Sequence, residues 1–198
     1  MKKIYSLLTL AVLSTLVCAG CVEKTPIYYG TAFNKAQAER QMRPGRNTVI
    51  VNCFTKAYMD DSISTCAGVP TLLMPATERA AEFTQIIFGS AAGGKRKNSK
   101  LRQTTKRMVD DPDFDTLYMS QKCDSDGFSV FKKVSDGEFY VFSGAGGYSY
   151  AEKISVRGGE TKKVVLSGTA SGQRGGFDYE LWERNERRRE WEARQRKK

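Results

Sequence analysis

Residues 123–143, CDSDGFSVFKKVSDGEFYVFS, constrain the fold more than any other stretch of this chain. Two runs rich in Phe, Tyr and Val are each preceded by a cluster of Asp, Ser and Gly. Aromatic and β-branched residues favour strands, and Asp, Ser and Gly favour the tight turns between them. The stretch therefore predicts two strands joined as a β-hairpin, within an antiparallel β-sandwich.

Seven residues of this stretch follow one another at characteristic intervals: Asp124, Gly127, Phe131, Val134, Gly137, Phe139 and Val141. This pattern resembles the carboxypeptidase-regulatory-like (transthyretin-like) β-sandwich module, with Ser129 at a place where that family has an aromatic residue. Residues 150–156 and 161–167 resemble the closing hairpin of the same module.

A second resemblance lies upstream. Residues 65–82 are similar to a segment of bacterial lipoproteins that carry this module, although Thr71 and Arg79 stand where Val and Tyr are expected. Such modules mostly bind, brace or present other parts of a protein. The resemblance therefore implies a fold and no reaction.

The strand pattern extends upstream of this stretch. Residues 47–58 place Val49, Val51 and Cys53 on one face, which is the period of a half-buried strand. Residues 69–74 form a second strand, which Pro75 ends. We expect a mainly β protein, an antiparallel β-sandwich of about seven strands at residues 47–168, with one inserted helix and a charged C-terminal helix or tail.

The inserted helix is expected at residues 77–88. Thr77 is a suitable N-cap, and Gly89 can take the left-handed conformation that closes a helix. Ala80, Phe83 and Ile87 recur at helical spacing. This apolar stripe should pack on the sandwich, and a partner-binding face is the alternative.

The N-terminus has the pattern of a secretory signal peptide at residues 1–20. Lys2 and Lys3 precede an apolar core, and small residues lead to Cys21. This site resembles a bacterial lipobox, in which the cysteine is acylated, with palmitate for example, and becomes the first mature residue. Cys18 replaces the usual Leu, so Cys21 could instead remain an ordinary cysteine, and an uncleaved N-terminal anchor is a further alternative.

The expected location follows from the lipobox. Several acyl chains on one residue anchor a protein stably. Val22, and not Asp, follows Cys21, which resembles lipoproteins sent to the outer membrane. We expect a protein of the bacterial cell envelope, lipid-anchored at the outer membrane and facing the periplasm.

Cysteine usage predicts one disulfide. Of the five cysteines, Cys18 leaves with the signal peptide and Cys21 is lipidated. Cys66 and Cys123 both lie beside Gly-containing turns at the ends of predicted strands, whereas Cys53 lies in mid-strand, where a buried thiol fits. We favour a Cys66–Cys123 disulfide, and a Cys53–Cys66 pair is the alternative.

Two segments flank the predicted sandwich. Residues 21–46 suggest a tether with a short helix at 34–42, although Tyr28 and Tyr29 could instead add an edge strand. Residues 169–198 begin as a Gly-rich linker and become a charged tail, in which Trp182 and Trp191 could anchor a partner.

Residues 90–107 form a basic insertion, expected as a mobile loop before a short helix. Its cationic residues are Lys95, Arg96, Lys97, Lys100, Arg102, Lys106 and Arg107. They could bind lipid headgroup phosphates or acidic glycans, and a merely solvated loop is the alternative. Nucleic acid is not favoured, because few aromatic residues interleave with the charges.

The absence of histidine excludes Ser-His-Asp catalysis and histidine zinc sites. Asp60 and Asp61 suit a turn. The acidic cluster at Asp110, Asp111, Asp113 and Asp115 lacks the Gly and Glu of a calcium loop. We expect no metal and no cofactor, and a carboxylate-dependent envelope hydrolase remains the enzymatic alternative.

Together these features predict a non-enzymatic envelope lipoprotein that acts as a binding or structural module. One alternative is an accessory subunit of an envelope secretion or conjugation assembly, docking through the charged tail. Another is an anion-binding protein that uses the basic insertion.

Overall fold

The computed structural model describes residues 25–57, 62–109 and 112–170. The predicted signal peptide, Cys21, Asp60, Asp61, Asp110, Asp111 and the tail with Trp182 and Trp191 lie outside these residues. The described elements in chain order are α1 (Lys35–Gln41), β1 (Asn47–Ala57), β2 (Ile63–Thr65), β3 (Pro70–Pro75), α2 (Glu78–Phe88), β4 (Gly93–Lys97), α3 (Asn98–Thr105), η1 (Phe114–Thr116), β5 (Met119–Lys122), β6 (Phe128–Val134), β7 (Gly137–Ala145), β8 (Tyr148–Val156) and β9 (Thr161–Ala170).

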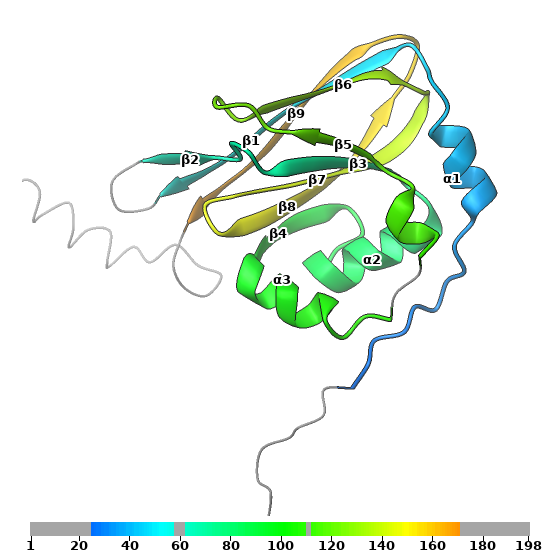
Figure 1. The fold of residues 1–198 in the computed structure, drawn as a ribbon, viewed down its shortest axis with the longest axis horizontal. Helices are drawn as coiled ribbons and strands as arrows, with labels where there is room; N and C mark the ends of the chain where they lie inside the picture. Colours follow the sequence, from blue (N-terminus) through cyan, green and yellow to red (C-terminus); the bar gives the residue numbers. More distant parts are fainter. Residues whose placement is uncertain (1–24, 58–61, 110–111, 171–198) are drawn as a thin grey trace, which may run out of the picture.

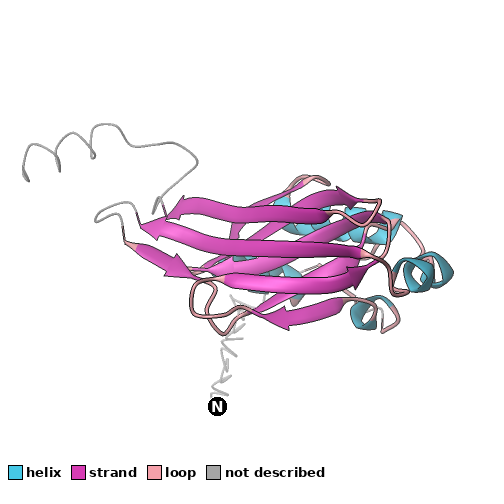
Figure 2. Cartoon of the chain, turned by 90° about the horizontal axis from the view of Figure 1, so that it is seen from above, coloured by secondary structure: helices cyan, strands magenta, loops and turns pink. Residues whose placement is uncertain are grey.

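Two sheets pack face to face, and the helices lie outside them (Figures 1 and 2). In the four-stranded sheet, β1 pairs antiparallel with β2 and β6 and runs parallel to β9. The five-stranded sheet has the order β4-β8-β7-β3-β5, with every pairing antiparallel. The predicted mainly β sandwich is confirmed, with more strands than the expected seven.

The core lies between the sheets because each strand turns alternate residues inward. On β1, Val49, Val51 and Cys53 are fully buried, as the sequence pattern predicts. Phe139 and Val141 of β7 face them from the other sheet and are also fully buried. Burial raises the pKa of the Cys53 thiol, which is free.

A disulfide ties the two sheets together. Cys66 follows β2 of one sheet and Cys123 follows β5 of the other, and their Cα atoms are 5.7 Å apart. The predicted Cys66–Cys123 pairing is confirmed, and the alternative Cys53–Cys66 pairing is wrong.

The predicted hairpins are wrong, although their strands exist. β6 pairs with β1, whereas β7 pairs with β3 and β8, so the turn between β6 and β7 passes from one sheet to the other. β8 and β9 likewise belong to opposite sheets. Lys133 near the end of β6 has φ 58° and lies at an irregularity in the pairing of β6 with β1, between the Phe131 and Val134 positions. Turn residues mark where a chain reverses, and they do not choose the partner strand.

The first part of the basic insertion is a strand and not a mobile loop. Gly93–Lys97 forms the edge strand β4, which pairs with β8 along its whole length. A Cβ atom at Gly93 would lie 2.2 Å from the Ala151 carbonyl oxygen, and its φ is 111°. Glycine, which suggested a loop, is what allows the two backbones to approach here.

Helix α2 matches its prediction closely. The Thr77 side chain accepts from the Ala80 amide, and Gly89 closes the helix at φ 82°. The helix packs on the outer face of the five-stranded sheet (Figure 1). Within the described residues, no helix is both long enough and apolar enough to cross a bilayer.

The predicted tether is part of the domain from Thr25 onward. Residues 25–33, which we call the N-terminal strap, lie against α2 and against the segment that follows α3. Ile27 forms an isolated bridge with Met108, so Tyr28 and Tyr29 do not build an edge strand. The predicted short helix is present as α1, with the Asn34 side chain accepting from the Gln37 amide.

Candidate functional site

A groove of about 550 Å³ lies between the outer face of the five-stranded sheet and the helices α2 and α3. Leu72 and Met74 of β3 and Phe142 of β7 contribute the sheet side. These side chains reach the outer face because Leu73 and Val141, their neighbours in sequence, point into the core. The groove therefore exists because both faces of β3 and β7 are apolar.

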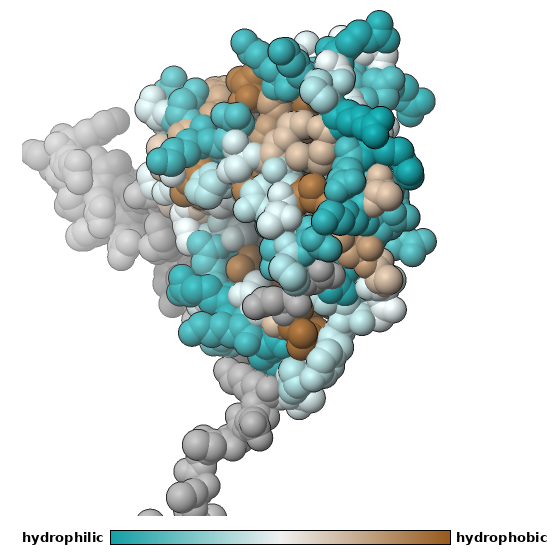
Figure 3. Space-filling model, turned by 45° about the vertical axis from the view of Figure 1, so that its right-hand side comes forward, coloured by the Kyte–Doolittle hydropathy of each residue, from teal (hydrophilic) through white to brown (hydrophobic). Residues whose placement is uncertain are grey.

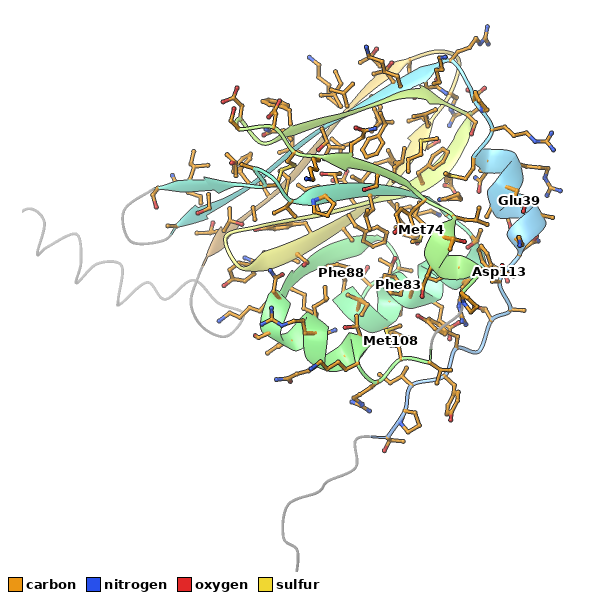
Figure 4. The ribbon with its side chains drawn as sticks, in the orientation of Figure 1. Glu39, Met74, Phe83, Phe88, Met108 and Asp113 are labelled. Atoms are coloured by element: carbon orange, nitrogen blue, oxygen red, sulfur yellow. A yellow bond between two sulfur atoms is a disulfide. The ribbon has the colours of Figure 1, made fainter. Side chains whose placement is uncertain are left out.

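The two helices form the opposite wall. Phe83, Ile87 and Phe88 come from α2, and Leu101 comes from α3. Phe83 and Phe88 lie between α2 and the sheet that carries Met74 (Figure 4). Helical spacing places Phe83 and Ile87 on one face, which is the apolar stripe that the sequence predicts.

Aromatic rings dominate the lining. The Phe142 ring centroid lies 5.9 Å from that of Phe83, edge to face, and 6.2 Å from that of Phe88. Phe83 in turn lies 5.6 Å from Phe114, which stands between Asp113 and Asp115 of the acidic cluster. Such ring pairs hold one another in place, so the lining is preorganised. Apolar side chains also reach the surface as separate patches elsewhere (Figure 3).

Beyond Phe142 the groove is bordered by bare backbone. Gly144 stands two residues further along the same face of β7, and a Cβ atom there would lie 2.9 Å from the Tyr148 carbonyl oxygen. Glycine at this position thus lets the backbones of β7 and β8 approach closely at the border of the groove. A side chain there would collide with the start of β8.

Polar side chains are a minority of the groove lining. Ser149 donates to the Asn98 side chain at 2.7 Å, which fixes the start of α3 on the beginning of β8. Among the described lining residues, Asp115 has the only charged side chain. The Tyr150 hydroxyl is buried at 2.5 Å from the Thr55 hydroxyl, and burial raises the pKa of Tyr150. The groove thus offers apolar contact with a small number of hydrogen-bonding groups.

Several residues of the predicted basic site make contacts within the fold. Arg96 donates to the Ile86 and Ile87 carbonyl oxygens and to Thr104, and so caps the C-terminal end of α2. The Lys95 ammonium lies 4.5 Å above the Tyr148 ring, and burial lowers its pKa, with the charge of Lys97 as a second cause.

Arg107 donates to the Thr25 carbonyl oxygen at 2.9 Å. Lys97 ends β4, and Lys100, Arg102 and Lys106 are exposed on α3 and at its C-cap. Anion binding by this insertion stays a prediction. Asp113 of the acidic cluster pairs with Lys35 at 3.0 Å.

The sequence did not lead to a prediction of the groove, although one feature of it indicates that the five-stranded sheet is covered on both faces. Residues 72–74 (LLM) and 139–142 (FYVF) are continuous apolar runs, which are typical of strands covered on both faces. That signal indicates a second layer over the sheet. It does not indicate that the layer leaves a groove.

No protein-family model and no curated protein matches this chain. Among solved structures, a proposed carbohydrate-binding protein from Pseudomonas aeruginosa superposes with a TM-score of 0.56 at 17% identity, over 70% of this chain and 99% of that chain. A minor pilin from Streptococcus agalactiae gives a TM-score of 0.33 at 11% identity, over 66% of this chain and 47% of that one.

The similarity to the Pseudomonas aeruginosa protein shows a shared mainly β fold. The TM-score of the minor pilin is too low to support a conclusion about this chain. The class defined here is therefore a two-sheet β-sandwich with a helix-covered groove. Membership of the carboxypeptidase-regulatory-like family stays a prediction.

Proposed function

We propose that this protein is a non-enzymatic binding module of the bacterial cell envelope, anchored by acylation of Cys21, and that the groove is its ligand site. The observation that carries the proposal is the preorganised aromatic lining around Phe142. A groove of about 550 Å³ falls within the usual range of small-molecule sites, which are mostly apolar with a few convergent polar groups.

The ligand that fits this lining best is largely apolar, with a polar group at one end. Leu72, Phe88, Leu101 and Phe142 offer surface whose burial contributes roughly 25 cal/mol per Å². Asn98 and Ser149 stand at the α3 end, where they can meet a hydroxyl or carbonyl group of the ligand.

A saccharide is the second candidate. Sugar rings stack their apolar faces on aromatic side chains, and Phe83, Phe142 and Tyr118 present such rings here. The likeness to the Pseudomonas aeruginosa protein, itself proposed to bind carbohydrate, favours this candidate. The small number of polar lining groups favours the apolar ligand.

A binding role is preferred to an enzymatic one on the chemistry of the lining. Carboxylate-dependent hydrolysis requires two facing acids, and Asp115 is the single acid among the described lining residues. The location rests on the sequence of residues 1–21, which resembles a signal peptide with a lipobox.

The site is tested by titrating the protein with a fluorescent fatty acid and, separately, with a panel of oligosaccharides. Leu101→Gln and Phe142→Ala should each weaken binding of the true ligand at least tenfold. The matched control is Phe128→Ala, which removes an exposed ring from the outer face of the other sheet. Equal affinities in the control and the groove variants would show that the groove is not the site.

The anchor is tested by intact mass and membrane fractionation of the native protein beside a Cys21→Ser variant. A native mass that fits acylated Cys21, with only the variant soluble, is the expected result. If both proteins are soluble and unmodified, the lipid anchor is wrong, while the groove can still be tested as above.

A further inference from the structure

The N-terminal strap fixes the point at which the chain enters the domain. Ile27 donates its amide to the Arg107 carbonyl oxygen at 2.6 Å, and the Val109 amide donates to the Ile27 carbonyl oxygen at 3.0 Å. Arg107 also donates to the Thr25 carbonyl oxygen. The first described residues therefore lie directly beside the C-terminal end of α3.

The rest of the strap is held on α2. The Glu82 carboxylate accepts from the Gly30 amide at 2.7 Å and from the Thr31 amide at 3.0 Å. Arg79 donates to the Thr31 carbonyl oxygen at 3.0 Å and stacks its guanidinium on the Tyr29 ring. These contacts make the strap a rigid part of the domain and not a free tether.

The strap limits how far the domain can move from an anchor at Cys21. Residues 22–24 alone separate Cys21 from Thr25, and a fully extended chain of this length spans at most about 14 Å. The part of the domain next to Thr25 must then lie close to the membrane. That part is the C-terminal end of α3, at the lower edge of the molecule in Figure 1.

Helix α3 carries exposed cations on the part of the domain that the short link to Cys21 places next to the membrane. Lys100, Arg102 and Lys106 are exposed, and within the described residues none of them forms a salt bridge. Arg102 and Lys106 are four residues apart and share one face of the helix. Leu101, on the other side, lines the groove. Three other cations of the insertion, Lys95, Arg96 and Arg107, instead donate hydrogen bonds to backbone carbonyl oxygens of the domain.

We propose that the basic face of α3, formed by Lys100, Arg102 and Lys106, rests on the anionic phospholipid headgroups of the membrane that carries the Cys21 anchor. The proposal rests on the lipid anchoring proposed above. A polybasic patch beside an acyl anchor is an established way to strengthen membrane attachment, and each cation at an anionic surface adds about fivefold in affinity. Phospholipid is chosen over acidic glycan because the short distance to Cys21 places this face at the lipid surface.

The first experiment uses the soluble Cys21→Ser protein and sedimentation with vesicles of phosphatidylglycerol and phosphatidylethanolamine. We expect salt-sensitive binding to these vesicles and none to phosphatidylcholine alone. Changing Lys100, Arg102 and Lys106 together to Glu should weaken binding at least a hundredfold. The matched control changes Lys122, Lys132 and Lys163 to Glu, which alters the net charge equally on exposed strand positions of the sandwich.

Three results would overturn the proposal. They are an equal loss of vesicle binding in the control variant, no loss of vesicle binding in the α3 variant, or binding to an acidic polysaccharide without binding to the anionic vesicles. Because this protein lacks the acyl group, the outcome does not depend on whether Cys21 is acylated in the cell. The sedimentation experiment and the test of the anchor therefore distinguish the absence of the lipid anchor from the absence of a contact between α3 and the membrane.

The second experiment uses the acylated protein reconstituted in the same anionic vesicles. An amine-reactive reagent should modify Lys100 and Lys106 several-fold more slowly than in the soluble protein, with Lys132 and Lys163 unchanged. Equal modification of all four lysines would show that α3 does not contact the membrane.

Discussion

The Asn47 side chain donates to the Asp136 carboxylate at 2.8 Å and thereby helps to join two of the turns that carry the chain between the sheets. It also donates to the Val134 carbonyl oxygen at the end of β6. Its own oxygen accepts from the Gly159 and Glu160 amides in the turn between β8 and β9. Asn47 is fully buried, so these bonds are shielded from water.

Asn47→Ala should therefore destabilise the fold strongly. The change leaves the Gly159 and Glu160 amides without their acceptor, and we expect a loss of about 3 kcal/mol in the free energy of unfolding, measured in urea. Asn52→Ala is the matched control, because Asn52 is half-buried on the outer face of β1 and makes a single bond of 3.3 Å. A loss in the Asn52 variant as large as that in the Asn47 variant would contradict the assigned role.

Removing the disulfide should lower stability without altering the core strands. The bond closes a loop with a sequence separation of 57 residues, and the loop-entropy model gives a contribution of roughly 4 kcal/mol. We expect a Cys66→Ala, Cys123→Ala double variant to lose stability on this scale in urea. Reducing agent should destabilise the native protein and leave the double variant unchanged. An equal response of both proteins would point to another cause.

Arg96→Lys should destabilise α2, although it conserves the charge. The guanidinium reaches the Ile86 and Ile87 carbonyl oxygens and the Thr104 hydroxyl at once, and a single ammonium cannot reproduce that geometry. We expect a loss of about 2 kcal/mol, seen as a lower midpoint of thermal unfolding. Lys100→Arg on exposed α3 is the control and should change stability by less than about 0.5 kcal/mol. Full stability in Arg96→Lys would show that the cap is dispensable.

The contact between the strap and α2 should weaken in acid. Burial opposes the charge on Glu82, but hydrogen bonds from Gly30 and Thr31, together with the Arg79 charge, hold its pKa below the ordinary value of 4.5. Because this pKa is lowered, the carboxylate stabilises the fold above pH 4.5. This contribution is lost as the pH falls through the lowered pKa.

Hydrogen exchange of the Gly30 and Thr31 amides measures this effect, after correction for the intrinsic pH dependence of exchange. Their protection should fall in acid, and Glu82→Gln should lower it already at neutral pH and remove the acid-dependent step. Glu78→Gln, at the first position of the same helix, should keep the step. Persistence of the step in Glu82→Gln would assign it to another group.

Several features were predictable because neighbouring residues encode them. The alternation of Val49, Val51 and Cys53 specifies which face of β1 is buried, and Thr77 and Gly89 mark the ends of α2 by satisfying its free backbone groups. Cys66 and Cys123 lie at the ends of their strands, where a bridge between sheets is possible.

The site was only partly predictable. The sequence marks 90–107 as basic, yet Lys95, Arg96 and Arg107 are engaged by Tyr148, α2 and Thr25, which lie in other parts of the chain. Leu72, Leu101 and Phe142 meet in the groove from three separate segments. No local pattern relates segments that far apart.

The sequence by itself thus determined where β1, β3, α2, β6, β7, β8 and β9 lie and which face β1 buries in the core, and it favoured the Cys66–Cys123 pair. Only the tertiary structure decided that β6 and β7 belong to different sheets, that Gly93–Lys97 is an edge strand, and that the strap lies on α2. The physical reason is that burial periodicity and turn chemistry act over a few residues. The choice among possible strand partners depends on contacts between distant segments, such as those that Asn47 makes with both turns.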